Sequence, residues 1–432
     1  MQICNNIDTN EQGVLTFTGY STVELAEKYG TPLYLMDENK IREKMRTYKN
    51  AMEKYFGNGA APIYASKAAS FKRIYQIAAE ENIGIDVVSA GEIYTALAAG
   101  YDISRAFFHG NNKTEDEIAF AIKNGIGYFV ADSQSELEAI NLEAKKQGKV
   151  QKILLRITPG IDTHTNKKIA TGNVDSKFGM AIATGQAHDF VGMALEYDSL
   201  KLCGYHCHVG SQVFDAETFI DAVDIMMDFT LEIKEKYSFE PEILNLGGGF
   251  GVRYVASHPE LDIENSIREV GEVLDAKCRE LGVKKPRIMM EPGRSVVADA
   301  GMTLYTVGTV KQITKFKNYV AIDGGMTDNP RFALYDAEYT VINAKKATLP
   351  KNYRCTIVGK CCESGDIIQE DVHIAPPQKG DIIAVLTTGA YNYSMASNYN
   401  RIPKPPVVML SDKGDYVAVK RETYEDIIRN DV

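Results

Sequence analysis

A single lysine stands at the end of a short apolar run, in the stretch PIYASKAAS that spans residues 62–70. The run has the composition of a buried strand, and a helical pattern begins directly after it at Phe71. An ammonium at the mouth of a buried strand is either an ordinary lysine that reaches solvent or a group placed for chemistry. In the second case Lys67 is an amine that can form an imine with a carbonyl group. The groups at the ends of the other strands decide between these two interpretations.

Two further stretches place glycines beside groups that bind anions. The stretch NLGGGFG, residues 245–251, contains three consecutive glycines, whose backbone N–H groups can approach an anion closely and form a concave nest. The stretch EPGRS, residues 291–295, adds a carboxylate, a glycine and an arginine. The dinucleotide fingerprint G-x-G-x-x-G does not fit, because Val252 stands where its third glycine belongs. The two stretches therefore favour a phosphate site over a plain tight turn.

Histidines and cysteines alternate in the stretch CGYHCHVGSQ, residues 203–212, and zinc sites use both residue types. In a strand, successive side chains point to opposite faces, so His206 and His208 share one face and the two cysteines share the other. The spacing does not match a structural zinc site, and no second ligand pair follows. We therefore predict no metal ion here, and each histidine is either a hydrogen-bonded core group or part of a site.

A lysine, a phosphate-binding loop, a carboxylate and a histidine at the ends of strands together suggest pyridoxal 5′-phosphate as the cofactor. The lysine amine forms a Schiff base with this cofactor, and the glycine loop holds its phosphate. An acidic residue keeps the pyridine nitrogen protonated, so that the ring can act as an electron sink. This hypothesis gives the ammonium of Lys67 a chemical role.

Short apolar runs alternate with segments of helical period from residue 62 onward, which predicts an α/β protein. Each run is nearly continuous, as expected for a parallel sheet covered on both faces. Eight such units predict a closed (β/α)₈ barrel, with an open doubly wound sheet as the alternative. The predicted strands are residues 62–66, 85–89, 106–110, 128–132, 152–159, 202–209, 243–247 and 287–291. The predicted helices between them include residues 92–99, 114–123, 135–146, 216–236 and 263–281.

The pattern changes after the eighth predicted strand. Residues 303–323 and 353–386 read as strands with turns and without crossover helices, which favours a mostly antiparallel domain. The first residues end in another strand-like run, TPLYLMD, which can pair with that domain. We predict a cofactor-binding barrel at residues 38–299 and a β-rich domain formed by residues 1–37 and 300–432.

Composition excludes several classes of partner. The chain of 432 residues carries 48 basic and 58 acidic side chains, a net charge of −10 that argues against a nucleic-acid partner. No run approaches the roughly 18 apolar residues that span a bilayer, so we expect no membrane partner. The N-terminus has no secretory signal pattern, and the 7 cysteines are dispersed and odd in number. These features predict a soluble, cytoplasmic protein with free thiols.

The stretches YASKA, HCHVGSQ, LNLGGGFG and EPGRS resemble the fold-type III enzymes that use pyridoxal 5′-phosphate, a group that includes alanine racemase and ornithine decarboxylase. Five further stretches narrow the resemblance to the diaminopimelate decarboxylase family: FFHGNNKTEDE, HTNKKIATGNVDSKFG, MTDNPRFALYDA, CCESGD and GAYNYSMASNYNRIP. The matches extend from the first strand almost to the C-terminus. Any one motif is weak, but all of them in this order are highly specific.

The resemblance implies a role for each residue that matches a motif. Lys67 would carry the Schiff base and be displaced by the substrate amine, Glu291 would pair with the pyridine nitrogen, and His208 would stack on the ring. Lys67 and His208 are then catalytic residues as well as cofactor contacts. The other cofactor contacts that it implies are Ser211, Gly247, Gly248, Gly249, Gly293, Arg294 and Tyr391.

The resemblance also implies the reaction, decarboxylation of meso-2,6-diaminoheptanedioate to L-lysine and CO₂ as the last step of lysine biosynthesis. The distal end of this small amino-acid substrate is a zwitterion. Glu363 would accept its ammonium, and Arg294 and Arg331 would bind its carboxylate. Tyr335 and Tyr391 would complete the substrate contacts. Because a buried charge left unpaired is costly, a substrate without the distal carboxylate should be rejected.

Cys362 resembles the proton donor of the family and would be the third catalytic residue. In the family this segment reaches the active site of the partner subunit, which implies a homodimer with shared sites. Four positions depart from the family pattern: Lys360 replaces a proline, Pro330 precedes Arg331, Asn392 follows the pocket tyrosine where glycine is common, and Asn166 stands where a histidine is frequent. The doublet of Cys361 and Cys362 leaves two candidate thiols, and the spacing to the following glutamate favours Cys362.

Two alternative functions remain open from the sequence. One is a decarboxylase of the same fold that acts on another basic amino acid or on carboxynorspermidine. The other is a non-catalytic homologue that binds the cofactor. The polar stretch at residues 160–178 is expected to form a flap over the site.

Overall fold

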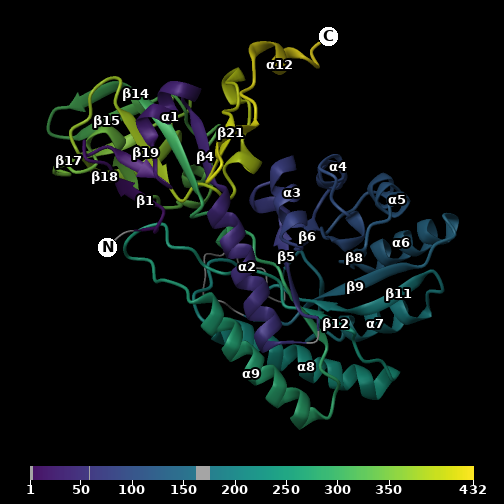
Figure 1. Cartoon of the computed structure of the whole chain (residues 1–432). Helices are drawn as coiled ribbons and strands as arrows, with labels where there is room; N and C mark the ends of the chain where they lie inside the picture. The colour runs from purple at the N-terminus through teal and green to yellow at the C-terminus, as the bar shows by residue number, and fades with distance from the viewer. Residues whose placement is uncertain (1–2, 58, 162–175) are drawn as a thin grey trace. The chain divides into compact units, whose positions relative to one another are not determined.

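The computed structural model describes residues 3–57, 59–161 and 176–432, and the chain forms two compact units (Figure 1). We name the segments Met1–Arg42, Val252–Glu260 and Arg294–Val432 the β unit, and Glu43–Gly251 and Leu261–Gly293 the barrel unit. The domain bounds predicted from the sequence stay a prediction. The predicted flap falls mostly on residues 162–175, which lie outside the described residues.

Eight parallel strands close into a ring in the described part of the barrel unit. The ring closes because β8 pairs with β9 and β13 pairs with β5. Each predicted strand overlaps one of these eight, so the (β/α)₈ barrel is confirmed and the open sheet is wrong. The bounds are β5 (Ala61–Ala65), β6 (Gly84–Val87), β7 (Ala106–Phe108), β8 (Tyr128–Ala131), β9 (Gln151–Thr158), β11 (Leu200–His206), β12 (Ile243–Asn245) and β13 (Arg287–Met290).

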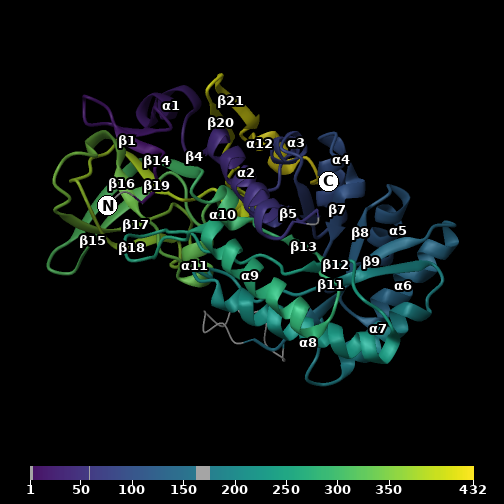
Figure 2. The same cartoon turned by 60° about the horizontal axis from the view of Figure 1, so that its bottom comes forward.

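Helices cover the outside of the barrel, and polar caps fix where several of them begin. The side chains of Ser89, Thr114 and Ser133 accept hydrogen bonds from backbone N–H groups in the first turns of their helices. Figure 2 shows α8 and α9 side by side along one flank of the barrel. None of the described helices is both long enough and apolar enough to cross a membrane. The bounds are α3 (Lys72–Glu80), α4 (Ala90–Ala98), α5 (Glu115–Lys123), α6 (Gln134–Lys146), α7 (Gln186–Glu196), α8 (Glu217–Tyr237) and α9 (Ile263–Leu281).

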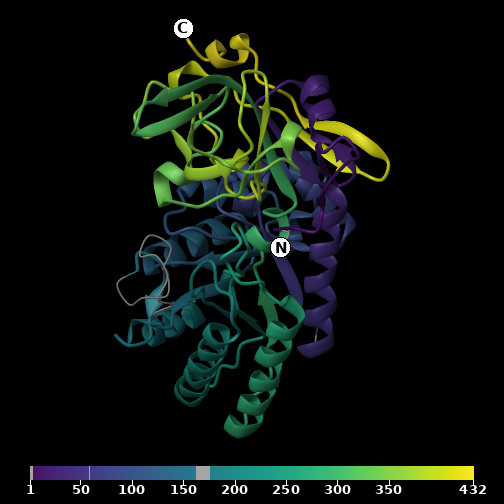
Figure 3. The ribbon, with the colours of Figure 1, turned by 90° about the vertical axis from the view of Figure 1, so that its left-hand side faces the viewer.

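The β unit is a mostly antiparallel sheet, as predicted. Strand β4 (Leu33–Asp37), from the first part of the chain, pairs antiparallel with β14 and parallel with β20, so the early TPLYLMD run does join the C-terminal region. Figure 3 shows helix α1 (Thr22–Tyr29) beside the hairpin of β20 and β21, where Lys28 bonds Asp415 at 2.7 Å. The other main strands are β14 (Gly301–Ile313), β15 (Lys317–Ile322), β16 (Val341–Asn343), β17 (Tyr353–Val358), β18 (Ile367–Ile374), β19 (Ile382–Leu386), β20 (Val407–Ser411) and β21 (Gly414–Val419).

A buried ion pair fixes the loop that follows β7. The Nζ atom of Lys113 lies 2.7 Å from Oε1 of Glu136, and the two side chains are only 1% and 4% exposed. The same ammonium donates hydrogen bonds to the backbone carbonyls of Gly110 and Val130 at 2.8 and 2.9 Å. Burial lowers the pKa of Lys113 and raises that of Glu136, and the attraction between them opposes both shifts. Removal of either side chain would therefore leave the other charge buried without its partner.

We predict that Lys113→Met lowers the free energy of unfolding by about 3–5 kcal/mol, because it leaves a carboxylate buried without its cation. Urea denaturation measures this change. Lys201→Met is the matched control, since Lys201 pairs with Glu242 at 2.8 Å while both side chains are about half exposed. That surface pair should contribute little that is measurable. Equal effects of the two substitutions would contradict the prediction.

Candidate active site

The carboxylate of Glu291 lies where several strands of the barrel end. Glu291 follows β13 directly and is only 7% exposed. The side-chain amide of Asn245, the last residue of β12, donates a hydrogen bond to its Oε1 at 2.7 Å. The Nε2 atom of His109, which follows β7, lies 2.8 Å from Oε1. The Nε2 atom of His206, at the end of β11, lies 3.2 Å from Oε2. Residues at the ends of four strands therefore converge on one carboxylate.

This environment keeps Glu291 ionised. Burial would raise the pKa of Glu291, but the two histidines outweigh it and hold the pKa well below its usual value. Burial lowers the pKa of His206 to about 4, so this imidazole is neutral at neutral pH. A buried carboxylate that stays ionised is suited to bind a protonated ring nitrogen.

His109, His206 and Glu291 also place three ligand-type atoms within 4.8 Å of one another. This set differs from the cysteine and histidine pattern that the sequence suggested, since it draws on a second histidine and a carboxylate. Two imidazoles and a carboxylate can hold a transition metal. However, the carboxylate already accepts the amide of Asn245 and faces both imidazoles. We therefore interpret the cluster as the support that orients Glu291.

Three glycines after β12 bring separate backbones into close contact. A Cβ atom at Gly247, Gly248 or Gly249 would lie 2.5, 2.1 or 2.4 Å from a backbone carbonyl oxygen. Gly247 and Gly249 also have φ angles of +69° and +114°, which favour glycine. The N–H of Gly248 donates to Nδ1 of His208 at 3.3 Å. At Gly293 a Cβ would lie 2.7 Å from a side chain of β5. Such a cradle of bare backbone is suited to a phosphate group.

Lys67 lies at the end of β5 in a short 3-10 turn, Ser66–Ala68, and its side chain is exposed. Burial raises the pKa of Asp86 to about 6 and that of Glu92 to about 7, and the charge of Lys67 opposes both shifts. The pKa of His208 is held well below its usual value, mainly by burial and next by the positive charge of Lys67. The ammonium therefore lies near His208, whose loop also carries Ser211 three residues later.

The β unit holds a second cluster, in which tyrosines enclose two buried arginines. Arg294 opens α10 (Arg294–Val297), Arg331 opens α11 (Arg331–Tyr335), and each is 8% exposed. Their Nη1 atoms donate to the phenol oxygen of Tyr254 at 3.0 and 3.1 Å. Their guanidinium carbons lie 4.8 and 5.6 Å from the ring centre of Tyr391, and that of Arg331 lies 6.0 Å from the ring centre of Tyr335. Two cations held together out of water attract an anion such as a carboxylate.

Two of the departures from the family pattern directly adjoin residues of this cluster. Pro330 adopts φ −81° and ψ −4° directly before α11, so the helix begins at Arg331 without distortion by the proline. Asn392 is fully buried, and its amide donates to the backbone carbonyl of Thr388 at 3.1 Å. Tyr391 has φ +63°, which is uncommon for a residue other than glycine and is typical of constrained functional positions.

One buried carboxylate, that of Asp366, holds two loops of the β unit together. Its Oδ2 accepts the N–H of Cys361 at 2.7 Å, and its Oδ1 accepts the N–H of Met326 at 2.6 Å. Met326 belongs to the loop that leads to Arg331. A single side chain that is 3% exposed therefore fixes both the arginine loop and the CCESGD segment.

The two adjacent thiols differ in their surroundings. Burial, together with the charge of Asp366, raises the pKa of the Cys361 thiol to about 11. Cys362 is exposed, and so is Glu363 next to it. The backbone N–H of Cys362 donates to Oδ1 of Asn400 at 2.8 Å, which fixes this stretch of the chain.

The residues predicted from the sequence are divided between the two units. The barrel unit holds Lys67, His208, Ser211, Gly247, Gly248, Gly249, Glu291 and Gly293, and the β unit holds Arg294, Arg331, Tyr335, Cys362, Glu363 and Tyr391. The sequence analysis missed His109, Asn245, Tyr254 and Asp366. His109 and Asn245 lie within the last three residues of the predicted strands 106–110 and 243–247, so a search for polar residues near strand ends would find them. Tyr254 and Asp366 carry no such local signal.

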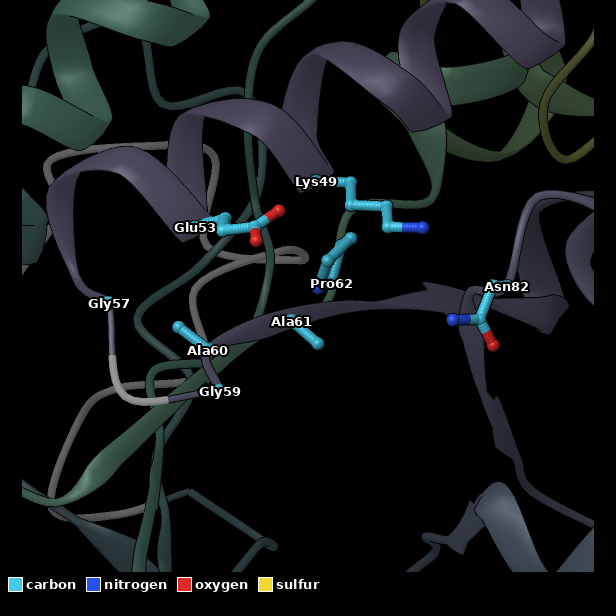
Figure 4. A pocket seen from close by; sticks show the side chains of 8 residues that line it. All are labelled: Lys49, Glu53, Gly57, Gly59, Ala60, Ala61, Pro62 and Asn82. Carbon is cyan, nitrogen blue, oxygen red and sulfur yellow. The ribbon is translucent and has the colours of Figure 1, made fainter.

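A separate cavity of about 450 Å³ lies at the opposite end of β5 (Figure 4). Lys49 and Glu53 of α2 (Glu38–Tyr55) line it together with Ala61 and Pro62, where the strand begins. Barrel enzymes carry their chemistry at the carboxyl ends of the strands, where Lys67 and Glu291 lie. This cavity is therefore not the candidate active site.

Comparison with known proteins identifies the class that the barrel and its strand-end groups define. Residues 38–298 match the family model of the pyridoxal binding domain of pyridoxal-dependent decarboxylases. Diaminopimelate decarboxylases of Bacillus subtilis and Staphylococcus aureus are each 44% identical to 98% of the chain, which covers 96% and 98% of their own lengths. The chain thus belongs to the diaminopimelate decarboxylase family.

Solved structures agree with this assignment. The diaminopimelate decarboxylase of M. jannaschii in complex with L-lysine has a TM-score of 0.91 at 36% identity, with 100% of this chain and 99% of that one covered. The Helicobacter pylori enzyme, also complexed with L-lysine, has a TM-score of 0.85 at 32% identity over 94% of this chain and 98% of that one. A lysine/ornithine decarboxylase from Vibrio vulnificus, at 21% identity and a TM-score of 0.77, shares the fold.

The resemblance seen in the sequence is therefore confirmed, and pyridoxal 5′-phosphate is the cofactor of the family. The residues present fit this group. The bare-backbone cradle at residues 247–249 has room for no side chain, as a phosphate site requires. The ionised carboxylate of Glu291 could pair with a protonated pyridine nitrogen, and Lys67 would supply the amine.

We predict that Gly248→Ala weakens binding of pyridoxal 5′-phosphate by roughly tenfold or more, because the added methyl overlaps the carbonyl oxygen of Glu291 and shifts the cradle. Titration of the visible absorbance of the bound cofactor measures the affinity. Gly308→Ala is the control, since the nearest atom to its Cβ lies at 3.7 Å. Wild-type affinity in the Gly248→Ala variant would show that the cradle does not hold the cofactor.

Proposed function

We propose that the protein decarboxylates meso-2,6-diaminoheptanedioate to L-lysine and CO₂, the last step of lysine biosynthesis. The observation that carries this proposal is the pair of buried arginines that converge on Tyr254, because a carboxylate is the natural ligand of two convergent guanidinium groups. The names of the relatives with 44% identity and the L-lysine complexes of the solved relatives support the same substrate.

Residues of the barrel unit would hold the cofactor and keep it in its active charge state. Lys67 would bind it through the ε-amine, and the cradle at residues 247–249, with Ser211 nearby, would hold its phosphate. Glu291 would accept a hydrogen bond from the ring nitrogen, and His208 would pack against the ring. When bound, pyridoxal 5′-phosphate supplies an electron sink for the charge left on the substrate carbon as CO₂ departs.

The distal end of the substrate would be recognised by residues of the β unit. Arg294 and Arg331 would bind its carboxylate, with Tyr335 and Tyr391 as neighbours. Glu363 would accept its ammonium. Both charges of the zwitterion would then be paired, and a diamine precursor without the distal carboxylate would leave two buried cations without their anion.

Cys362 is our candidate for the general acid that protonates the substrate carbon after CO₂ has left. Its thiol is exposed, whereas the Cys361 thiol is half-buried next to Asp366 and has a raised pKa. A proton donor open to bulk water cannot control which group it protonates. We therefore propose that a second copy of the chain covers this segment, in a homodimer with shared active sites. Free thiols also support a reducing location such as the cytoplasm.

The substrate assay tests the reaction. We expect the purified protein with added cofactor to release CO₂ from meso-2,6-diaminoheptanedioate and to form L-lysine. L-Ornithine, L-lysine and L-arginine should give at least about 100-fold lower kcat/KM, because their one carboxylate is the group that would leave, so none remains at the distal end when they bind as substrates. Preference for one of these three would reassign the substrate. Cofactor binding without turnover of any of them would indicate a non-catalytic homologue.

A second prediction concerns the two thiols. Cys362→Ser should lower kcat by roughly 100-fold or more, the typical contribution of a positioned proton donor. Cys361→Ser is the matched control and should stay within a few-fold of wild type, because it keeps the backbone N–H that Asp366 accepts and replaces the thiol with another small group that can hydrogen-bond. A larger loss in Cys361→Ser would exchange the roles of the two residues.

Mixing two impaired variants tests the shared site. Suppose that each site takes Lys67 from one chain and Cys362 from the other. A dimer of one Lys67→Ala chain and one Cys362→Ser chain then has one site with both defects and one intact site. Random re-association of the subunits should then restore about a quarter of wild-type activity. No restoration after verified subunit exchange would place Lys67 and Cys362 of the same chain in one site.

A further inference from the structure

Arg294 and Arg331 form a pair of like charges that is largely removed from water. Each side chain belongs to a residue that is 8% exposed, and both guanidinium groups reach the same phenol oxygen. Bringing two cations together in a buried place costs free energy unless nearby groups compensate for the charge. The Nε atom of Arg331 is also buried without a hydrogen-bond partner among the described residues. This cluster is therefore prepared for an anion.

The group that holds the pair together is Tyr254. Its oxygen accepts Nη1 of Arg294 at 3.0 Å and Nη1 of Arg331 at 3.1 Å, and its ring centre lies 6.0 and 5.5 Å from the two guanidinium carbons. Burial would raise the pKa of this phenol, but the two positive charges outweigh it and lower the pKa from its ordinary value. The phenol oxygen thus carries part of the negative charge that the two arginines require.

Tyr254 is itself fixed in place. Its residue is 4% exposed, and its backbone carbonyl accepts the hydroxyl of Thr340 at 2.8 Å. Its backbone N–H donates to Nδ1 of His258 at 3.3 Å. The ring of Tyr339 meets its ring edge-on, with 5.4 Å between the centres and 87° between the planes. Contacts on several sides leave the phenol little freedom to turn away from the arginines.

We propose that Tyr254 is a positioning residue that holds Arg294 and Arg331 at the separation at which one carboxylate bridges them, and that it thereby sets the preference for a substrate with a distal carboxylate. Two N–H groups that converge on one oxygen at about 3 Å have the geometry that a carboxylate also requires. Each guanidinium has further N–H donors beyond the one given to the phenol. The carboxylate can therefore bind beside the phenol without displacing it.

The inference rests on the proposed function, because it takes the bound anion to be the distal carboxylate of the substrate. Two diamines that differ by this group allow a direct test. L-Lysine, the product, retains the distal carboxylate, whereas cadaverine has lost it. Binding of both to the holoenzyme can be followed through the absorbance of the bound cofactor, without turnover.

Tyr254→Phe removes one oxygen atom and keeps the ring that packs against Tyr339. We expect the dissociation constant of L-lysine to rise by about tenfold or more, since a hydrogen bond to a charged group contributes strongly, while that of cadaverine stays within about twofold. In turnover assays KM should rise with kcat nearly unchanged. Tyr29→Phe is the matched control, because its phenol bonds Asp415 elsewhere in the β unit.

The other outcomes are distinct. Equal weakening of both ligands in Tyr254→Phe would mean that the phenol supports the fold in general, and unchanged binding of both would mean that the arginines need no such support. Either result overturns the inference. If the wild-type protein itself binds L-lysine no better than cadaverine, the proposed recognition of a distal carboxylate fails first. Thermal unfolding of the variant shows whether the β unit remains folded.

Discussion

A carboxylate removed from water must be hydrogen-bonded if it is to stay ionised, and the barrel unit is organised around one such group. Glu291 is reached by Asn245, His109 and His206, which lie at the ends of three other strands. These residues are distant in the sequence, and only the closed ring of strands brings them to one place. The barrel therefore provides more than a surface for loops, because it fixes the charge state of the acid that would face the cofactor ring.

In the β unit the buried charges are positive, and different groups compensate for them. Two buried cations, Arg294 and Arg331, are held by a phenol oxygen and by aromatic faces. Aromatic rings offer weak attraction to a cation without carrying a full negative charge. A carboxylate side chain in the same position would satisfy the arginines permanently and would compete with an incoming anion. Tyrosines compensate part of the charge and leave the cluster able to bind a ligand.

Much of the barrel could be predicted from the sequence, because each buried strand is a continuous apolar run and each helix has its own periodicity. The close backbone contacts at the glycine triplet and the burial of Glu291 at a strand end agree with what the sequence suggested, while their roles toward the cofactor stay predictions. The roles of Arg331, Cys362 and Glu363 came from the family resemblance alone. Tyr254 was not predictable, because its segment belongs to the β unit while the chain on both sides belongs to the barrel unit. The contact of His109 with Glu291 likewise depends on closure of the ring.

The carboxylate of Asp366 has a consequence for how this enzyme could change over evolutionary time. It anchors the backbone both at Met326, on the way to Arg331, and at Cys361, next to the exposed thiol. An insertion or deletion in either loop would strain the common anchor and move the other loop with it. The proposed recognition of a substrate by Arg331 and the proposed delivery of a proton by Cys362 would thus be inherited together. New specificities on this scaffold should arise by exchange of side chains within loops of constant length.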